Sequence, residues 1–256
     1  MVLACMTTSF AQAGVVCTLL TDAGSGRVLV QQGDCARRNS PASTFKIAIA
    51  LMGYDAGLLR DAHNPAWPYR PEYPAWRENW KQTTDPTLWL ANSVVWYSRL
   101  ITQDLGRARF QAYVDRLGYG NRDLSGDPGK DNGLTNAWLS SSLQISPEEE
   151  VAFVRKLLNR RLPVSARAMT MTETIIPTAA LADGWTAHGK TGAGDLPGSG
   201  RQFGWYVGWV ENGDRKVVFA RLIKDDVKRD GPAGFRARDG LLADLPGLLR
   251  PSAASR

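Results

Sequence analysis

The sequence predicts an α+β fold in which an antiparallel sheet is flanked by helices and carries an inserted, mostly helical lobe. Strand-like segments lie near both ends of the chain, at residues 15–32 and 185–223, and the long stretch between them carries helix signals. With 256 residues, 43% of them hydrophobic, the chain can bury a full core. We therefore expect residues 14–256 to form a single domain, with the helical lobe at roughly residues 55–175.

Residues 1–13 look like the remnant of a secretory signal peptide. A short apolar segment ends in Ala11-Gln12-Ala13, which has the form of an Ala-x-Ala cleavage site, although a basic start is missing. The mature chain is then expected to begin near Gly14 and to be exported. No apolar run in the sequence is long enough to span a membrane.

The first two strands are expected to form a hairpin. Residues 15–21 and 27–32 are joined by the turn at residues 23–26, which places Cys17 opposite residue 32 or 33. Cys35 can then reach Cys17, and we expect the two to form a disulfide in an oxidising compartment. The alternative is two unpaired thiols.

Residues 40–52 form the most informative segment. Pro41 followed by small polar residues marks a helix start, and residues 47–52 are apolar all round, which predicts a buried helix. Ser43 and Lys46 then lie one turn apart on the same face. Because burial favours the neutral amine, this pair could form a base-activated nucleophile. The alternative is a helix cap followed by a lysine that reaches solvent.

Several helices are expected in the middle of the chain. A short one opens at Asp85-Pro86, others cover residues 93–103 and 107–117 with Gly118 as the stop, and residues 119–123 form a turn. A capping box at residues 146–149 starts a helix that runs through Leu158. The acidic run at residues 148–150 is expected on a solvated helix face, without a catalytic role.

The pattern changes to strands after Gly184. Residues 185–191, 203–211 and 216–223 each suit a sheet, and Asn212-Gly213 predicts a tight hairpin between the last two. A loop rich in glycine and proline is expected from Ala193 to Arg201, and a final amphipathic helix from about Arg238.

The charge pattern narrows the classes of ligand. The net charge is +6 and the isoelectric point is near 9.4, yet the basic residues are scattered, which argues against a nucleic-acid surface. A mildly positive field suits a small anionic substrate. With only His63 and His188 and so few cysteines, neither a metal site nor a Ser-His-Asp triad is expected.

Four motifs, in this order along the chain, carry a family resemblance: Ser43-x-x-Lys46, Ser93-x-Val95, Tyr119-Gly120-Asn121 and Lys190-Thr191-Gly192. Together they resemble the serine β-lactamases of class D, the oxacillinase type. The second motif, Ser-Val-Val rather than Ser-Asp-Asn, points to class D. Residues 138–146 and 204–209 also look like that family, so the resemblance covers nearly the whole mature chain.

The resemblance implies a mechanism centred on Ser43 and Lys46. Ser43 would attack the lactam carbonyl to form an acyl-enzyme, and the backbone N–H groups of Ser43 and Ala193 would form the oxyanion hole. Lys46 would be carboxylated by carbon dioxide or bicarbonate, and the carbamate would act as general base in both steps. No other cofactor is implied.

The same resemblance assigns the substrate contacts. Ser93 would relay a proton to the lactam nitrogen, while Lys190 and Thr191 would help bind the substrate carboxylate and polarise Ser93. Arg238 is the best match by register for the arginine that binds this carboxylate, and Arg236 is the competitor.

The remaining matched residues would build the pocket around Lys46. Val95 and Leu139 would wall it, and Trp138 would supply an indole N–H to the carbamate. Tyr119 and Asn121 would give structural support. Departures from the family pattern at Ala193-Gly194 and at Tyr206 bear on the range of substrates.

The resemblance thus implies an enzyme that hydrolyses β-lactam antibiotics and confers resistance. Its partner would be a small β-lactam substrate, with no nucleic acid and no membrane, and it would be periplasmic and either a monomer or a homodimer. Two alternatives share the nucleophile: a β-lactam-sensing receptor domain, and a penicillin-binding transpeptidase or carboxypeptidase. Both acylate but do not turn over.

Overall fold

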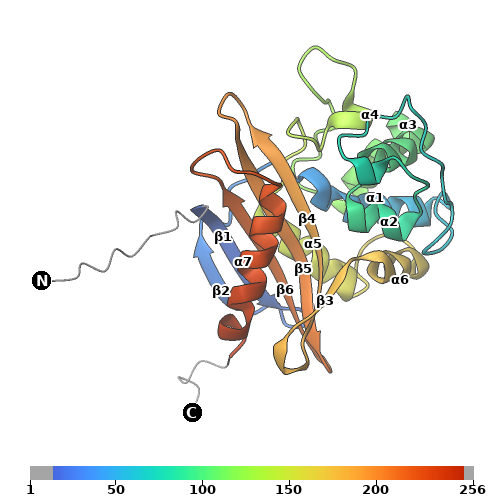
Figure 1. The fold of residues 1–256 in the computed structure, drawn as a ribbon. Helices are drawn as coiled ribbons and strands as arrows, with labels where there is room; N and C mark the ends of the chain where they lie inside the picture. The colour runs from blue at the N-terminus through green and yellow to red at the C-terminus, as the bar shows by residue number, and fades with distance from the viewer. Residues whose placement is uncertain (1–13, 251–256) are drawn as a thin grey trace, which may run out of the picture.

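The computed structural model describes residues 14–250 and confirms the predicted α+β fold with an antiparallel sheet. Six strands pair in the order β2-β1-β6-β5-β4-β3, and every neighbouring pair is antiparallel (Figure 1). The strands are β1 (Gly14–Asp22), β2 (Val28–Gly33), β3 (Thr178–Ala180), β4 (Thr186–Leu196), β5 (Arg201–Asn212) and β6 (Arg215–Lys224). The predicted signal-peptide remnant, residues 1–13, lies outside the described residues, as do residues 251–256.

Helices cover both faces of the sheet and gather beside its β4 edge (Figure 1). They are η1 (Ala42–Phe45), α1 (Lys46–Asp55), η2 (Glu78–Trp80), α2 (Pro86–Asn92), α3 (Val95–Leu117), α4 (Gly133–Asn136), α5 (Pro147–Leu158), α6 (Ala166–Ile175), η3 (Ala182–Gly184) and α7 (Ala233–Leu248). Helix α7 packs on strands β4 to β6, α5 packs on β1, β5 and β6, and α1 packs against α3 and α6. Within residues 14–250, no helix combines the length and apolarity needed to cross a membrane.

Local capping signals set several helix ends where the sequence predicts them. The Asp85 side chain accepts a hydrogen bond from the Leu88 N–H at the start of α2, and Gly118 ends α3 in the left-handed conformation. Ser146 and Glu149 form the predicted capping box of α5. These contacts satisfy backbone groups within a few residues, which explains why the sequence reveals them.

Two predicted boundaries are wrong. Strand β4 continues to Leu196 and β5 begins at Arg201, so most of the expected loop from Ala193 is strand. Pairing with β5 supplies the hydrogen bonds that the glycine-rich sequence does not favour locally. Helix α7 begins at Ala233, five residues before the predicted start. Strand β3 and helices α4 and α6 were not predicted.

The acidic run at the start of α5 corrects another prediction. Glu148 is exposed, and Glu149 pairs with Arg38 at 2.5 Å, as a solvated face requires. Glu150, however, is fully buried. It lies on the same helix face as Pro147, Val151 and Val154, all of which pack inward. The prediction of a solvated face therefore fails for Glu150.

The predicted disulfide is present. Strand register places Cys17 opposite Gly33, within the predicted interval, and the bond joins Cys17 to Cys35 with Cα atoms 5.0 Å apart. Both cysteines are buried. The disulfide therefore ties the end of the β1–β2 hairpin to the segment that leads to η1.

Candidate active site

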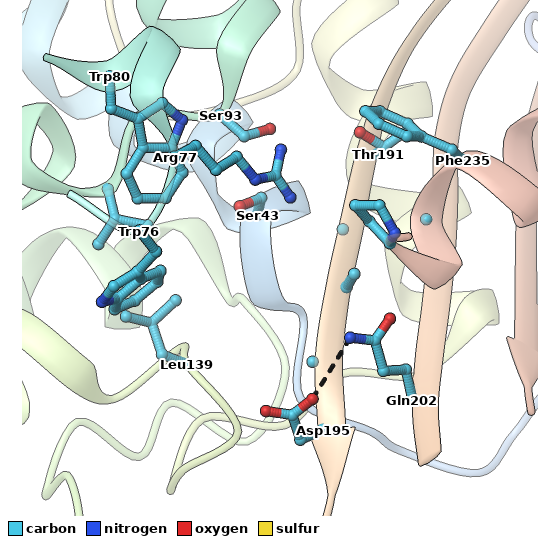
Figure 2. A pocket seen from close by; sticks show the side chains of 16 residues that line it. Ser43, Trp76, Arg77, Trp80, Ser93, Leu139, Thr191, Asp195, Gln202 and Phe235 are labelled. Carbon is cyan, nitrogen blue, oxygen red and sulfur yellow. Dashed lines mark hydrogen bonds between the residues drawn. The ribbon is translucent and has the colours of Figure 1, made fainter. Parts of the chain in front are cut away.

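A cleft of about 210 Å³ lies between strand β4 and the helical lobe (Figure 2). Six of the residues singled out in the sequence line it: Ser43, Ser93, Val95, Leu139, Thr191 and Ala193. They come from four separate segments of the chain. The fold therefore gathers half of the predicted site residues at one opening.

Ser43 and Lys46 are in hydrogen-bond contact at the base of this cleft. Ser43 lies in η1 and Lys46 begins α1, so the two follow one another on a continuous helical path. The Lys46 Nζ atom lies 3.0 Å from the Ser43 Oγ atom. Lys46 is fully buried, whereas Ser43 faces the cleft. The arrangement joins an accessible hydroxyl to a buried amine.

The surroundings of Lys46 favour its neutral form. Burial is the main cause that holds the pKa of Lys46 well below 10.5, and the nearby positive charges of Lys190, Arg77 and Arg99 lower it further. A neutral amine can accept a proton or add carbon dioxide, and an ammonium can do neither. The site thus meets the first chemical requirement of a base at this position.

A second serine–lysine pair lies beside the first. Lys190 on β4 is almost fully buried and donates hydrogen bonds to the Ser93 hydroxyl and, at 3.0 Å, to the Thr191 carbonyl. Burial, with the charge of Arg77 as a smaller cause, lowers the pKa of Lys190 to about 7. Ser93 has φ of 57°, a left-handed conformation that a serine adopts only under constraint. The turn between α2 and α3 thus aims its hydroxyl at Lys190.

The nucleophile turn packs tightly against β4. A Cβ atom added at Gly192 would lie 2.8 Å from the Pro41 carbonyl oxygen, so only glycine fits there. Beyond His188, this edge of β4 has no strand partner among residues 14–250. The backbone around Ser43 and the backbone of Ala193 therefore border the same opening, as two hydrogen-bond donors to one oxyanion must.

Trp138 is buried next to this turn with its indole N–H unpaired. Its ring packs on Phe45 at 5.7 Å, and its Nε1 atom has no hydrogen-bond partner among the described residues. The Ser40 hydroxyl donates to the Trp138 carbonyl at 2.9 Å and holds the segment in place. A buried N–H normally has an acceptor. The lowered pKa of Lys46, the unpaired indole N–H and the apolar Val95 and Leu139 are each what a carbamate on Lys46 would require.

Tyr119 and Asn121 lie behind the cleft and hold other segments. The Tyr119 hydroxyl donates to Glu150 Oε1 at 3.0 Å. The Asn121 side-chain amide donates to the Ser142 carbonyl and accepts from the Gln144 N–H. Neither residue lines the cleft. These contacts join the turn at residues 119–121 to α5 and to the segment at residues 142–144.

The two candidate arginines have different surroundings. Arg236 pairs with the buried Asp225 at 2.6 Å, so its charge is already neutralised. Arg238 pairs with Asp239 at 2.7 Å and borders a second cavity, which Lys190 and Thr191 also line. Neither arginine lines the cleft that contains Ser43.

One arginine that the sequence did not single out does line the cleft. Figure 2 shows the Arg77 side chain pointing from the lobe toward Ser43 and Ser93, between Trp76 and Trp80. Its guanidinium lies over the Trp80 ring at 5.7 Å and has no carboxylate partner within residues 14–250. This arginine lies in an irregular segment rich in proline and aromatics, where no local pattern marks a site.

Geometry of this kind defines a class of protein. A serine beside a buried lysine whose pKa is lowered, a second serine–lysine pair and an edge strand are the parts of a serine acyl-transfer site. Within residues 14–250, no group of three or more His, Cys, Asp or Glu side chains could hold a metal ion. Residues 16–243 match the family of the penicillin binding protein transpeptidase domain.

Comparison with individual proteins narrows the class to one family. The chain is 45% identical to β-lactamase OXA-9 of Klebsiella pneumoniae over 240 residues, covering 91% of this chain and 88% of the relative. It is 35% identical to β-lactamase OXA-1 of Escherichia coli, covering 90% and 83%. A crystal structure of OXA-427 class D β-lactamase is 49% identical, with a TM-score of 0.84 and coverage of 91% and 98%. The chain belongs to the class D β-lactamases, which confirms the resemblance.

Proposed function

We propose that this protein hydrolyses the amide bond of β-lactam antibiotics through an acyl-enzyme on Ser43 and so confers resistance to them. The 3.0 Å contact between Ser43 Oγ and the buried Lys46 Nζ carries this proposal. It joins a nucleophile to a base at the bottom of an open cleft. Membership of the class D family supports the same reaction.

Acylation uses groups already in place. The Ser43 oxygen bonds to the lactam carbonyl carbon and gives its proton to the base at Lys46. Backbone N–H groups of Ser43 and Ala193 stabilise the negative charge on the carbonyl oxygen. The lactam C–N bond then breaks, and Ser93 delivers a proton to the leaving nitrogen. Lys190 can replace that proton because its pKa is near 7.

Deacylation requires a base that activates water. Carbon dioxide bound covalently to the Lys46 amine would supply a carboxylate oxygen for this task. Trp138 Nε1 would hold that group, and Val95 and Leu139 would exclude bulk water around it. Water bonds to the acyl carbon, and the bond to Ser43 Oγ breaks as the serine regains its proton.

Arg77 is proposed as the guanidinium that binds the substrate carboxylate. It lines the cleft with Ser43, Ser93 and Thr191, and no protein carboxylate neutralises it within residues 14–250. Its charge is among the causes that lower the pKa of both Lys46 and Lys190. Arg238, matched by register, borders the second cavity instead. A guanidinium suits a carboxylate because it can donate two parallel hydrogen bonds.

An oxidising compartment is part of the proposal. The buried bond between Cys17 and Cys35 supports export to the periplasm, where such bonds persist. The Ala-x-Ala site at residues 11–13 of the sequence is in keeping with that route.

Turnover of a chromogenic cephalosporin in large excess over enzyme tests the function. Continuous hydrolysis over many equivalents is expected of a β-lactamase. A burst of one equivalent followed by silence would overturn the proposal and identify a sensor or a penicillin-binding transpeptidase.

A further inference from the structure

A buried chain of four oxygen atoms lies directly behind the nucleophile turn. Thr44 Oγ1 lies 2.8 Å from the Pro41 carbonyl oxygen and 2.7 Å from Glu150 Oε1. The Tyr119 hydroxyl lies 3.0 Å from the same Glu150 Oε1. Thr44, Tyr119 and Glu150 are all buried from solvent. Three short contacts therefore connect η1, the turn after α3 and the first turn of α5.

Three hydrogen bonds need three protons, but the two hydroxyl groups supply only two protons. The Thr44 and Tyr119 hydroxyls have one proton each, and the Pro41 carbonyl has none. If Glu150 were ionised, the Thr44 proton could serve either Pro41 or Glu150 but not both. One pair of oxygens would then face each other without a proton.

A proton on Glu150 Oε1 completes the chain in one consistent direction. With that proton in place, Tyr119 would donate to Oε1, Oε1 would donate to Thr44 Oγ1, and Thr44 would donate to the Pro41 carbonyl. The other oxygen, Oε2, is buried and has no partner, which a carbonyl-type oxygen tolerates better than an anionic one.

The charged and titratable neighbours also favour the protonated acid. Burial raises the pKa of Glu150 to about 7, with a smaller contribution from the negative charge of Glu149, and outweighs the opposing hydrogen bonds of Thr44 and Tyr119. Glu149 is itself paired with Arg38. Burial raises the pKa of Tyr119 well above 10, so that hydroxyl keeps its proton.

The chain ends on atoms that shape the oxyanion hole. Thr44 lies between Ser43 and the rest of the motif, and a Cβ atom added at Gly192 would lie 3.2 Å from both Thr44 Cγ2 and Thr44 N. The Pro41 carbonyl also accepts the Thr44 N–H at 3.1 Å. Any shift of this turn therefore moves the Ser43 N–H relative to Ala193, the residue after Gly192.

We propose that Glu150 is a positioning residue that acts as a neutral carboxylic acid, whose proton locks the Ser43 turn against Gly192 and Ala193. Loss of that proton breaks the hydrogen bond from Thr44 to Pro41 and loosens the oxyanion hole. This inference rests on the proposed function. It predicts that ionisation of Glu150 adds to the decline of kcat at alkaline pH that deprotonation of Lys190 causes. This decline is separate from any acidic decline caused by Lys46.

The Glu150→Gln variant tests the proposal, with Glu148→Gln, an exposed position one residue from the capping-box glutamate, as matched control. Glutamine cannot ionise and its amide can still donate to Thr44. We expect Glu150→Gln to retain kcat for a penicillin within about threefold at mildly acidic pH. It should lose the part of the alkaline decline that Glu150 causes and keep the part caused by deprotonation of Lys190, whose pKa is about 7. Glu148→Gln should keep both parts. An alkaline decline that persists unchanged in Glu150→Gln would overturn the proposal.

Two further measurements test the proposal by readouts other than the pH profile of kcat. Infrared difference spectra of wild type against Glu150→Gln should show a carboxylic-acid band in mildly acidic buffer that gives way to carboxylate bands as pH rises. A carboxylate band at all pH values would overturn the neutral acid. The Glu150→Leu variant should lower kcat by roughly tenfold or more with less effect on KM, because leucine cannot donate the hydrogen bond to Thr44 that holds the turn in position. If wild type itself fails to hydrolyse penicillin, the proposed function fails, while the infrared result still decides the protonation of Glu150.

Discussion

The Lys46 amine and the Ser43 hydroxyl lie 3.0 Å apart, yet only the serine reaches the cleft. Burial strips the lysine of the water that would stabilise its charge, and the adjacent cations act in the same direction. The same short helical path therefore exposes the nucleophile and neutralises its base. The first three predictions test this pair and its surroundings.

Replacing Ser43 by alanine should abolish acylation with little loss of stability. Alanine fits the first helical turn, and the hydrogen bond of the Ser43 hydroxyl is with the Lys46 amine rather than with a helix end. Intact-mass spectrometry after penicillin treatment should show an adduct on wild type and none on Ser43→Ala. Ser93→Ala serves as control and should still form an adduct, slowly. An adduct that persists in Ser43→Ala would remove the serine from its role.

Activity should depend on bicarbonate at mildly acidic pH. Because the pKa of Lys46 lies well below 10.5, its amine becomes neutral at lower pH than an exposed lysine, but falling pH still protonates it and releases the carbamate. Activity should therefore fall as pH drops below neutral and recover when bicarbonate is added. Progress curves should bend in bicarbonate-free buffer. Lys46→Ala should acylate slowly and deacylate more slowly still. Indifference to bicarbonate across this range would mean that plain lysine is the base.

Trp138→Phe should weaken the hold on carbon dioxide. The change removes the unpaired Nε1–H and keeps an aromatic ring on Phe45. We expect the bicarbonate concentration for half-maximal activity to rise about tenfold, since a hydrogen bond to a charged group is lost. The control is Trp89→Phe, which removes a buried N–H that donates to Ser98 at 2.9 Å. If both variants keep the wild-type bicarbonate dependence, Trp138 does not hold the carbamate.

A matched pair of substrates should separate Arg77 from Arg238. The free acid of a penicillin and its methyl ester differ only in the charge of the carboxylate. The ratio of kcat/KM for the free acid to kcat/KM for the ester should fall about tenfold in Arg77→Gln, because a charge-assisted pair is lost. Arg238→Gln should leave that ratio within about twofold. The reverse result would mean that Arg238, the residue matched by register, binds the substrate carboxylate.

Thiol labelling should find no free cysteine in unfolded, unreduced protein that begins at Gly14. The bond between Cys17 and Cys35 spans 18 positions in sequence, and its loss should lower the free energy of unfolding by about 3 kcal/mol on the chain-entropy view. Denaturant titration of the variant that carries both Cys17→Ser and Cys35→Ser measures this loss. Two labelled thiols would refute the pairing and weaken the case for export.

Local chemistry explains what could be predicted from the sequence. Ser43 and Lys46 share a helix face because they are one turn apart, and Asp85, Gly118 and the capping box at residues 146–149 satisfy helix ends within a few residues. The hairpin register that brings Cys17 to Cys35 follows from one short turn. Such interactions join residues that are close in the sequence, so the sequence alone is enough to predict them.

Contacts between distant segments decided the rest. Only packing of η1, α5 and the turn after α3 buries Glu150, which by local pattern belongs on a solvated face. Only the meeting of the lobe with β4 aims Arg77 into the cleft, and pairing with β5 extends β4 through a glycine-rich segment. The physical reason is the same in each case: burial and charge depend on which surfaces meet, and that is settled by the whole fold.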